Sequence, residues 1–208
     1  MGIAERKEKQ KLEIRKMILE ASMKLFVEEG FESVSIRKIA DLIEYSPTTV
    51  YLYFKDKDEI FYDLHNIGFQ KFQELNKDLP AIENPLVRLH KMGENYIHFG
   101  MENREYYDLM FILRAPMETL AQIKGPDCVW VGGDSALNNL KATLDECMER
   151  GFVRKTDLDV MAMTVWGMVH GWVSLAIRER FEKMVPKEEI LPTMLKSLDW
   201  LIKTIALK

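Results

Sequence analysis

Hydroxyl and aromatic side chains gather between residues 46 and 53, where the sequence reads Ser-Pro-Thr-Thr-Val-Tyr-Leu-Tyr. Hydroxyls can bind phosphate oxygens, while methyl groups and aromatic rings can contact the edges of DNA bases. The chain has no nucleophile elbow, no phosphate-binding loop and no His-Glu-x-x-His pattern. The chemistry predicted from this segment is therefore recognition of duplex DNA rather than catalysis.

A helical wheel over residues 47–54 assigns faces to these side chains. Val50 and Phe54 point inward on the wheel. The opposite side and its two flanks carry Thr48, Leu52, Tyr51, Thr49 and Tyr53. Ser35, at a helix N-terminus, and Lys57 are expected to hold phosphates on either side of this surface. The alternative is that Ser46-Pro47 only starts a helix whose aromatics are core residues, and for Tyr53 this alternative stays open.

The elements that position this segment are predicted to be helices. Apolar residues repeat at helical spacing from Ile14 to Leu25, and Gly30 ends that helix. Ser35 caps a second helix, Ser46-Pro47 opens a third, and Asp56 opens a fourth that runs to about Lys77. The second and third helices form a helix-turn-helix over residues 35–54.

The rest of the chain is also predicted to be helical, with no alternating strand pattern. Further helices are expected at residues 86–102, 105–113, 135–150, 157–183 and 190–206, with a loop over residues 124–134. The predicted fold class is all-α with about nine helices. An N-terminal domain over residues 12–72 is followed by a larger helical domain over residues 73–208.

Composition bounds the function classes. Of 208 residues, 47% are hydrophobic and 30% are charged, which is typical of a soluble globular protein. The net charge of −4 counts mildly against nucleic acid, but residues 1–16 hold six basic and three acidic residues. No apolar run is long enough to predict a membrane span. Cys128 and Cys147 lack metal or redox spacing, so a reducing cytoplasmic location is expected.

The N-terminal motifs resemble those of the tetracycline-repressor (TetR) family. The matching segments are Ser35-Ile36-Arg37-Lys38-Ile39-Ala40 and Ser46-Pro47-Thr48-Thr49-Val50-Tyr51-Leu52-Tyr53-Phe54-Lys55-Asp56-Lys57. The resemblance is strong over about residues 12–72, and the Tyr-x-Tyr-Phe-Lys-x-Lys ending is highly characteristic. It implies a ligand-responsive DNA-binding regulator, most often a repressor, that needs no cofactor and no metal.

The resemblance also implies roles for individual residues. Arg37 would face a base or a phosphate. Base edges would be contacted by Pro47, Thr48 and Tyr51, and phosphates would be held by Ser35, Thr49, Tyr53 and Lys57. This chain departs from the family at Glu44, where a turn glycine is usual, and at Thr48, where Gly or Ala is common.

The larger domain is expected to bind an effector and to dimerise. Amphipathic helices at residues 157–183 and 190–206 are predicted to form a four-helix dimer interface with a second copy of the chain. The two helix-turn-helix domains of such a dimer would read an inverted repeat. The run Trp166-x-x-x-His170-Gly171 resembles a Trp-His-Gly motif of one C-terminal subclass. An apolar or aromatic effector would contact Met92, Tyr96, Phe99, Tyr107, Met110, Phe111, Met163, Trp166 and His170. For each of these residues an ordinary core or interface position is the alternative.

Two other classes compete with a regulator. An all-α enzyme or metal protein would use His65, His90, His98 and His170, but no pair of these has ligand-type i, i+4 spacing. A protein-interaction module would account for residues 157–206 but not for residues 30–57. The helix-turn-helix therefore favours the regulator.

Overall fold

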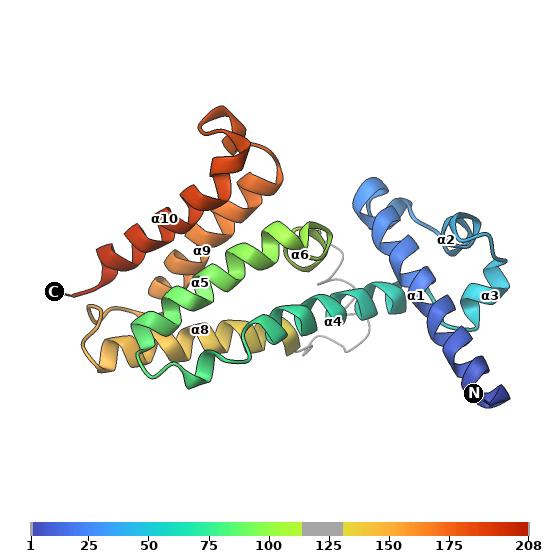
Figure 1. Ribbon diagram of the computed structural model, residues 1–208, viewed down its shortest axis with the longest axis horizontal. Helices are drawn as coiled ribbons and strands as arrows, with labels where there is room; N and C mark the ends of the chain where they lie inside the picture. Colours follow the sequence, from blue (N-terminus) through green and yellow to red (C-terminus); the bar gives the residue numbers. More distant parts are fainter. Residues whose placement is uncertain (1, 114–130, 208) are drawn as a thin grey trace. The chain divides into compact units, whose positions relative to one another are not determined.

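The computed structural model describes residues 2–113 and 131–207, and these residues fold into helices (Figure 1). The described part of the chain contains nine α-helices: α1 (Ile3–Glu29), α2 (Ile36–Leu42), α3 (Pro47–Tyr51), α4 (Lys57–Leu75), α5 (Pro85–Glu102), α6 (Arg104–Phe111), α8 (Val131–Glu149), α9 (Leu158–Ile177) and α10 (Lys187–Ile205). Three short 3-10 helices lie at Phe31–Ser33, Leu79–Ala81 and Phe181–Lys183. The only β pairing within the described ranges is an isolated bridge between Val153 and Ala206. The all-α prediction is confirmed.

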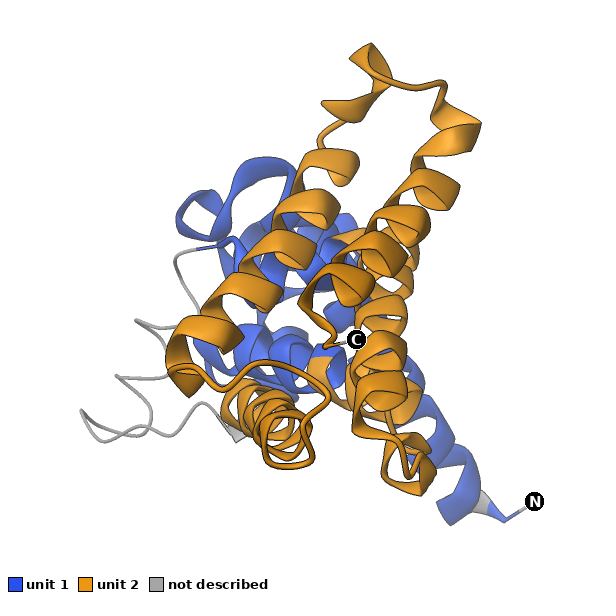
Figure 2. Ribbon diagram, turned by 90° about the vertical axis from the view of Figure 1, so that its left-hand side faces the viewer, with its two compact units in different colours: residues 1–68, 105–129 blue, residues 69–104, 130–208 orange. Residues whose placement is uncertain are grey.

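The chain divides into two compact units, which Figure 2 colours separately. The first unit spans residues 1–68 and 105–129, and the second spans residues 69–104 and 130–208. The domain boundary expected at residue 72 assigns α6 to the second domain. In the structure α6 groups with the first unit, because Leu109 is fully buried in that unit's core.

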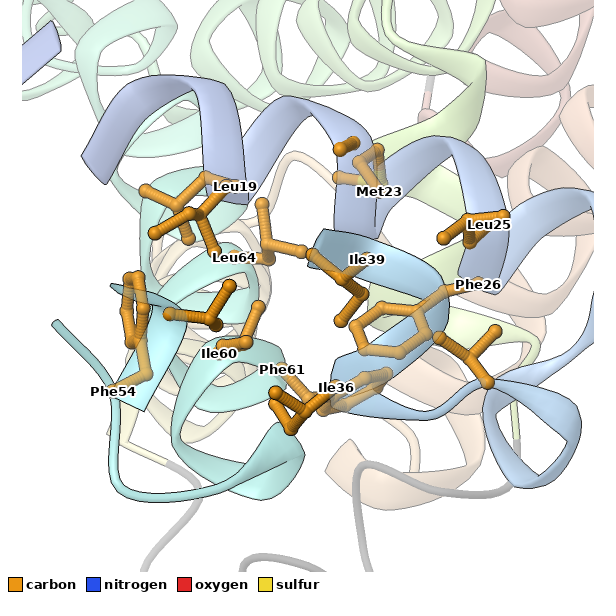
Figure 3. Packing of buried hydrophobic residues seen from close by; sticks show 14 of the residues in the cluster. Leu19, Met23, Leu25, Phe26, Ile36, Ile39, Phe54, Ile60, Phe61 and Leu64 are labelled. Atoms are coloured by element: carbon orange, nitrogen blue, oxygen red, sulfur yellow. The ribbon is translucent and has the colours of Figure 1, made fainter. Parts of the chain in front are cut away.

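The core of the first unit is built where α1, α2, α3 and α4 present their apolar faces. Figure 3 shows Ile36 and Ile39 of α2 directed toward Phe26 and Phe61. The rings of Phe26, Phe31 and Phe61 contact one another with centroids 5.0–5.7 Å apart, in tilted and edge-on geometries that favour aromatic pairs. This core holds the short helices α2 and α3, which are too short to be stable alone.

The second unit is organised around α5, which packs against α8, α9 and α10 (Figure 1). A half-buried ion cluster joins α5 to α8, because the Arg88 guanidinium pairs with Glu146 and also donates to the carbonyl of Ile82 at 3.0 Å. Arg150 adds a second contact to Glu146 at 2.7 Å. The two guanidinium groups lower the pKa of the Glu146 carboxyl. Removing one partner would leave charge with incomplete pairing, so this cluster is expected to hold the two helices in one register.

Two predicted boundaries are wrong. The helix expected over residues 157–183 ends at Ile177, because Glu179 adopts a left-handed conformation with φ 58°. The loop expected over residues 124–134 conflicts with α8, which begins at Val131. Gly132 lies against the Phe69 ring, and a Cβ there would stand 2.4 Å from a ring carbon. The Phe69 side chain leaves no room for a Cβ at this position, so glycine is the residue that fits here although its helix propensity is low. Residues 124–130, including Cys128, lie outside the described residues.

α9 carries three exposed large apolar side chains, Val160, Met163 and Leu175. By length and composition alone it is the one helix in the described ranges that could cross a membrane. Only 28% of its most apolar 18-residue segment is buried by the rest of the structure. The sequence predicts no membrane span, and a packed helix of a globular protein meets the same length and composition criteria.

Candidate functional site

Side-chain caps define the start of both helices in the helix-turn-helix. Ser35 Oγ accepts a hydrogen bond from the backbone N–H of Lys38 at 3.3 Å, and α2 begins at the next residue. Ser46 Oγ accepts from the backbone N–H of Thr49 at 3.2 Å, and Pro47 occupies the first position of α3. Both predicted caps are confirmed. Each hydroxyl accepts from a backbone N–H in the first turn of its helix, and the Thr49 N–H also donates to the Ser46 carbonyl at 2.9 Å.

The faces of α3 agree with the wheel. Val50 is fully buried and Phe54 is 2% exposed. The guanidinium of Arg15 lies over the Phe54 ring, 5.0 Å from its centroid, and pairs with Asp63. On the opposite side Thr48 is exposed, Tyr51 is 56% exposed and Leu52 is 76% exposed. The candidate DNA-reading side chains therefore project from a helix whose other face is locked into the core.

The remaining predicted DNA contacts are at intermediate or high exposure. Arg37 is almost fully exposed and stands 4.0 Å from Asp41, one turn along α2. Pro47, Thr49 and Tyr53 are half-buried. Lys57 is more constrained than the sequence suggests: its ammonium donates to the carbonyl of Phe31 at 3.0 Å and lies over that residue's ring.

The turn between α2 and α3 accommodates Glu44 without losing its hydrogen bonds. Glu44 takes φ 60°, in the left-handed region that glycine adopts more easily. Its backbone N–H donates to Asp41 at 3.3 Å, and the N–H of Tyr45 donates to Ala40 at 3.0 Å. The turn is regular, and the cost of departing from glycine is local backbone strain.

A polar cluster lies inside the second unit, among the residues predicted to contact an effector. The Tyr96 hydroxyl stands 2.9 Å from His170 Nδ1, and the Trp166 indole N–H donates to the same hydroxyl at 3.3 Å. Burial, with a smaller effect from Arg178, lowers the pKa of His170. A neutral ring can accept the Tyr96 proton at Nδ1 and carry its own proton on Nε2. This polar cluster (Tyr96, Trp166 and His170) joins α5 to α9.

The other predicted effector residues are not all brought to this cluster. Phe99 is buried and Met92 is half-buried on the same helix as Tyr96. Met163 is 75% exposed, on the outer side of α9. Three others belong to the first unit, where Tyr107 and Phe111 pair at 5.3 Å and Met110 lies against Gly68.

One residue beside the polar cluster is absent from the sequence-based set. The Phe72 ring meets Tyr96 edge-on at 5.8 Å and Phe99 at 5.2 Å. On the wheel Phe72 is simply an inward residue of the fourth helix, and no local pattern distinguishes it. Its contacts depend on how α4 and α5 pack.

The titratable groups of the described ranges were compared with the geometry that a metal ion requires. No group of three or more His, Cys, Asp or Glu residues there is placed to hold a metal ion. His65 is buried, and burial lowers its pKa to about 4. Cys147 is buried as well, which raises the pKa of its thiol to about 11 and makes it a poor nucleophile at neutral pH.

Comparison with known protein families matches most of this chain. The model described as "Bacterial regulatory proteins, tetR family" matches residues 18–64, which include the helix-turn-helix. The model described as "Tetracyclin repressor-like, C-terminal domain" matches residues 89–198. Together the two matches cover parts of both units, and the second alone spans more than half of the chain.

Individual relatives are more distant. The HTH-type transcriptional regulator HbdR of Aromatoleum sp. (strain CIB) is 26% identical over 166 residues, covering 77% of this chain and 69% of HbdR. The ketosteroid transcriptional regulator KstR2 of Mycobacterium tuberculosis superposes with a TM-score of 0.74 at 16% identity, over 93% of this chain and 95% of KstR2. The TetR family regulator PfmR of Thermus thermophilus has a TM-score of 0.68 at 21% identity, over 89% of this chain and 97% of PfmR. At these identities the two structures establish a shared fold.

Proposed function

The chain belongs to the TetR family of bacterial regulatory proteins and is a DNA-binding transcriptional regulator, and from this premise we propose that it is a cytoplasmic repressor released from an inverted-repeat operator by a small apolar or aromatic effector. The observation that carries the proposal is the arrangement of α3. Val50 is buried on one face while Thr48 and Tyr51 are exposed on the other, so a capped helix presents a recognition surface. A helix held in this way can enter the major groove.

We propose that base edges are contacted by Pro47, Thr48 and Tyr51, with Arg37 reaching a base or a phosphate. The phosphate contacts are assigned to Ser35, Thr49, Tyr53 and Lys57. Support comes from the exposure of Ser35 at the start of α2 and of Arg37 along its outer side. The Lys57 ammonium keeps its hydrogen bond to the Phe31 carbonyl, and its other N–H groups can donate to a DNA phosphate. Because few of the assigned contact residues are cations, DNA affinity depends on both helix-turn-helix domains of a dimer binding at once.

The second copy is proposed to cover the outer sides of α9 and α10. Exposed apolar and small residues lie along one side of α9. We call this surface the α9 stripe, and it consists of Val160, Met163, Gly167 and Leu175. Among the described residues, a Cβ added at Gly167 would meet nothing within 4 Å, so another helix can approach closely there. On α10, Trp200 is 63% exposed. A dimer through these helices buries this apolar surface and allows two α3 helices to read half-sites roughly 34–36 Å apart.

The effector is proposed to bind in the second unit near the polar cluster. Phe72 and Phe99 supply apolar surface beside Tyr96, and the hydroxyl, imidazole and indole groups supply polar contacts that can fix an orientation. We propose that the bound ligand favours a different packing of α5 against α9. In that packing the two helix-turn-helix domains no longer have the spacing that DNA binding requires, so the protein is released from DNA. Ligand and DNA then weaken each other's binding by the same factor.

The direct test is DNA binding by the full chain to the region upstream of its own locus, measured by gel shift at low salt. Binding to an inverted repeat is expected, and Thr48→Ala and Tyr51→Ala should each weaken it by about tenfold, the loss of roughly 1–2 kcal/mol at a base contact. Thr156→Ala is the matched control, because Thr156 is exposed and belongs to the second unit rather than to the helix-turn-helix. Absence of any shift, or equal binding by all three variants, would reject the proposal.

The effector part has a separate test. Apolar and aromatic small molecules are screened for release of the bound repeat. Tyr96→Phe removes one hydroxyl from the polar cluster, so DNA binding without effector is expected to persist while the effector concentration needed for release rises. Unchanged release by Tyr96→Phe would place the effector elsewhere.

A further inference from the structure

The outward side of α3 is poor in groups that read bases by paired hydrogen bonds. Residues 47–53 contain no Arg, Lys, Asn or Gln. Guanine is most often read by a bidentate Arg or Lys, and adenine by a bidentate Asn or Gln. Neither mode is open to the residues of α3 themselves.

The hydroxyls of α3 supply little discrimination in their place. Ser46 Oγ already accepts from the Thr49 N–H and lies 3.0 Å from Thr49 Oγ1, so this pair is engaged in capping the helix. Thr48 and Tyr51 expose hydroxyls, but a hydroxyl both donates and accepts. It can therefore satisfy either type of base edge, and specificity has to come from another interaction.

Apolar atoms are what the exposed side chains have in common. Leu52 is 76% exposed directly after α3, four residues beyond Thr48, so a leucine side chain and a threonine methyl lie on one side of the segment. Tyr51 adds a ring that is 56% exposed. One exposed leucine needs no explanation, but three such groups next to one another form an apolar strip (Thr48, Tyr51 and Leu52). In the major groove the matching apolar group is the C5 methyl of thymine.

We infer that the apolar strip reads thymine methyl groups, so that each half-site carries thymine at the base pairs facing Thr48, Tyr51 and Leu52. This inference rests on the proposed function and deepens it. The methyl group distinguishes T·A from C·G at these positions, while the phosphate contacts fix the register. Burial of one methyl group contributes about 0.8 kcal/mol, which corresponds to about fourfold in affinity for each thymine.

The test begins with selection of binding sites by the full-length protein from a randomised duplex library. Each thymine of the selected half-site is then replaced by deoxyuridine, which removes only the methyl group. At two or more positions in each half-site, uracil is expected to weaken binding about fourfold. Cytosine at the same positions should weaken it further, and 5-methylcytosine should recover part of the loss.

Protein variants assign the contact. Leu52→Ala is expected to bind thymine and uracil equally at one position while keeping the preference at the others. Leu42→Ala is the matched control: Leu42 is 44% exposed at the end of α2 but lies outside the strip, so every preference should persist. If a duplex is selected and uracil binds as well as thymine throughout, the inference is overturned and the proposed function stands. If no duplex is selected, both are rejected.

Discussion

The ammonium of Lys57 lies 4.3 Å from the ring centroid of Phe31 and donates to the carbonyl of the same residue at 3.0 Å. Lys57 begins α4, and Phe31 begins the 3-10 turn after α1. One side chain therefore ties the end of the helix-turn-helix to the exit of the first helix. A cation held over an aromatic ring has already lost part of its side-chain freedom, so less is lost when it makes the phosphate contact proposed for Lys57.

Lys57→Met is expected to have two effects. Loss of the ring contact and the hydrogen bond should lower the free energy of unfolding by about 1 kcal/mol. Loss of the proposed phosphate contact should reduce the slope of log affinity against log salt by about 0.9 for each half-site. Chemical denaturation and a salt titration of DNA binding measure the two separately.

Lys24→Met is the control for this change, since Lys24 is an exposed cation on α1 with no assigned DNA contact. It should alter neither quantity appreciably. A Lys57→Met protein that is destabilised but keeps its salt slope would make Lys57 a purely structural residue.

Replacement of Glu44 by glycine should relieve backbone strain in the turn between α2 and α3. A non-glycine residue at positive φ costs about 1 kcal/mol. The free energy of unfolding of Glu44→Gly is therefore expected to exceed that of Glu44→Ala by about 1 kcal/mol, and its denaturation midpoint should be higher. Glu44→Ala removes the carboxylate and keeps the strain, which separates charge from conformation. Glu179 has φ 58° in the second unit and serves as an independent case of the same substitution pair. Equal midpoints for the Gly and Ala variants would contradict the argument.

The proposed dimer predicts an unusual response at Gly167. A Cβ added there meets no atom of the described residues within 4 Å, whereas a large side chain would collide with the second helix of the proposed interface. Gly167→Leu is therefore expected to retain its helical circular dichroism, sediment as a monomer and lose most DNA affinity. Gly167→Ala is the matched control for helix propensity and should remain largely dimeric. A dimeric Gly167→Leu protein would remove α9 from the interface.

Burial of His65 predicts a dependence of stability on pH. Its pKa falls from 6.5 to about 4 in the folded protein, so below pH 6.5 the unfolded chain binds a proton that the folded chain does not. Stability should therefore decrease as the pH is lowered from 6.5 to 4, by about 3 kcal/mol, and this loss should level off below pH 4. His65→Gln should flatten this part of the profile in urea melts. His170, whose pKa is also lowered, contributes with the same sign and would remain in the variant.

Local patterns in the sequence determine much of the DNA-reading head. Ser35 and Ser46 predict the starts of α2 and α3, and Gly30, with φ 79°, ends α1 as expected. The wheel separates buried Val50 and Phe54 from exposed Thr48 and Leu52. These features follow from hydrogen bonds and periodicities within a few residues, so they can be inferred without knowing the fold.

Other features depend on residues far apart in the chain, and only the tertiary structure decides them. The requirement for glycine at position 132 comes from the Phe69 ring beside it. The grouping of α6 with the first unit depends on a core that buries Leu109. The bond between Tyr96 and His170 joins residues 74 positions apart. The physical reason is that packing energy comes from non-local contacts, which can exceed the weak local preferences that a sequence pattern reports.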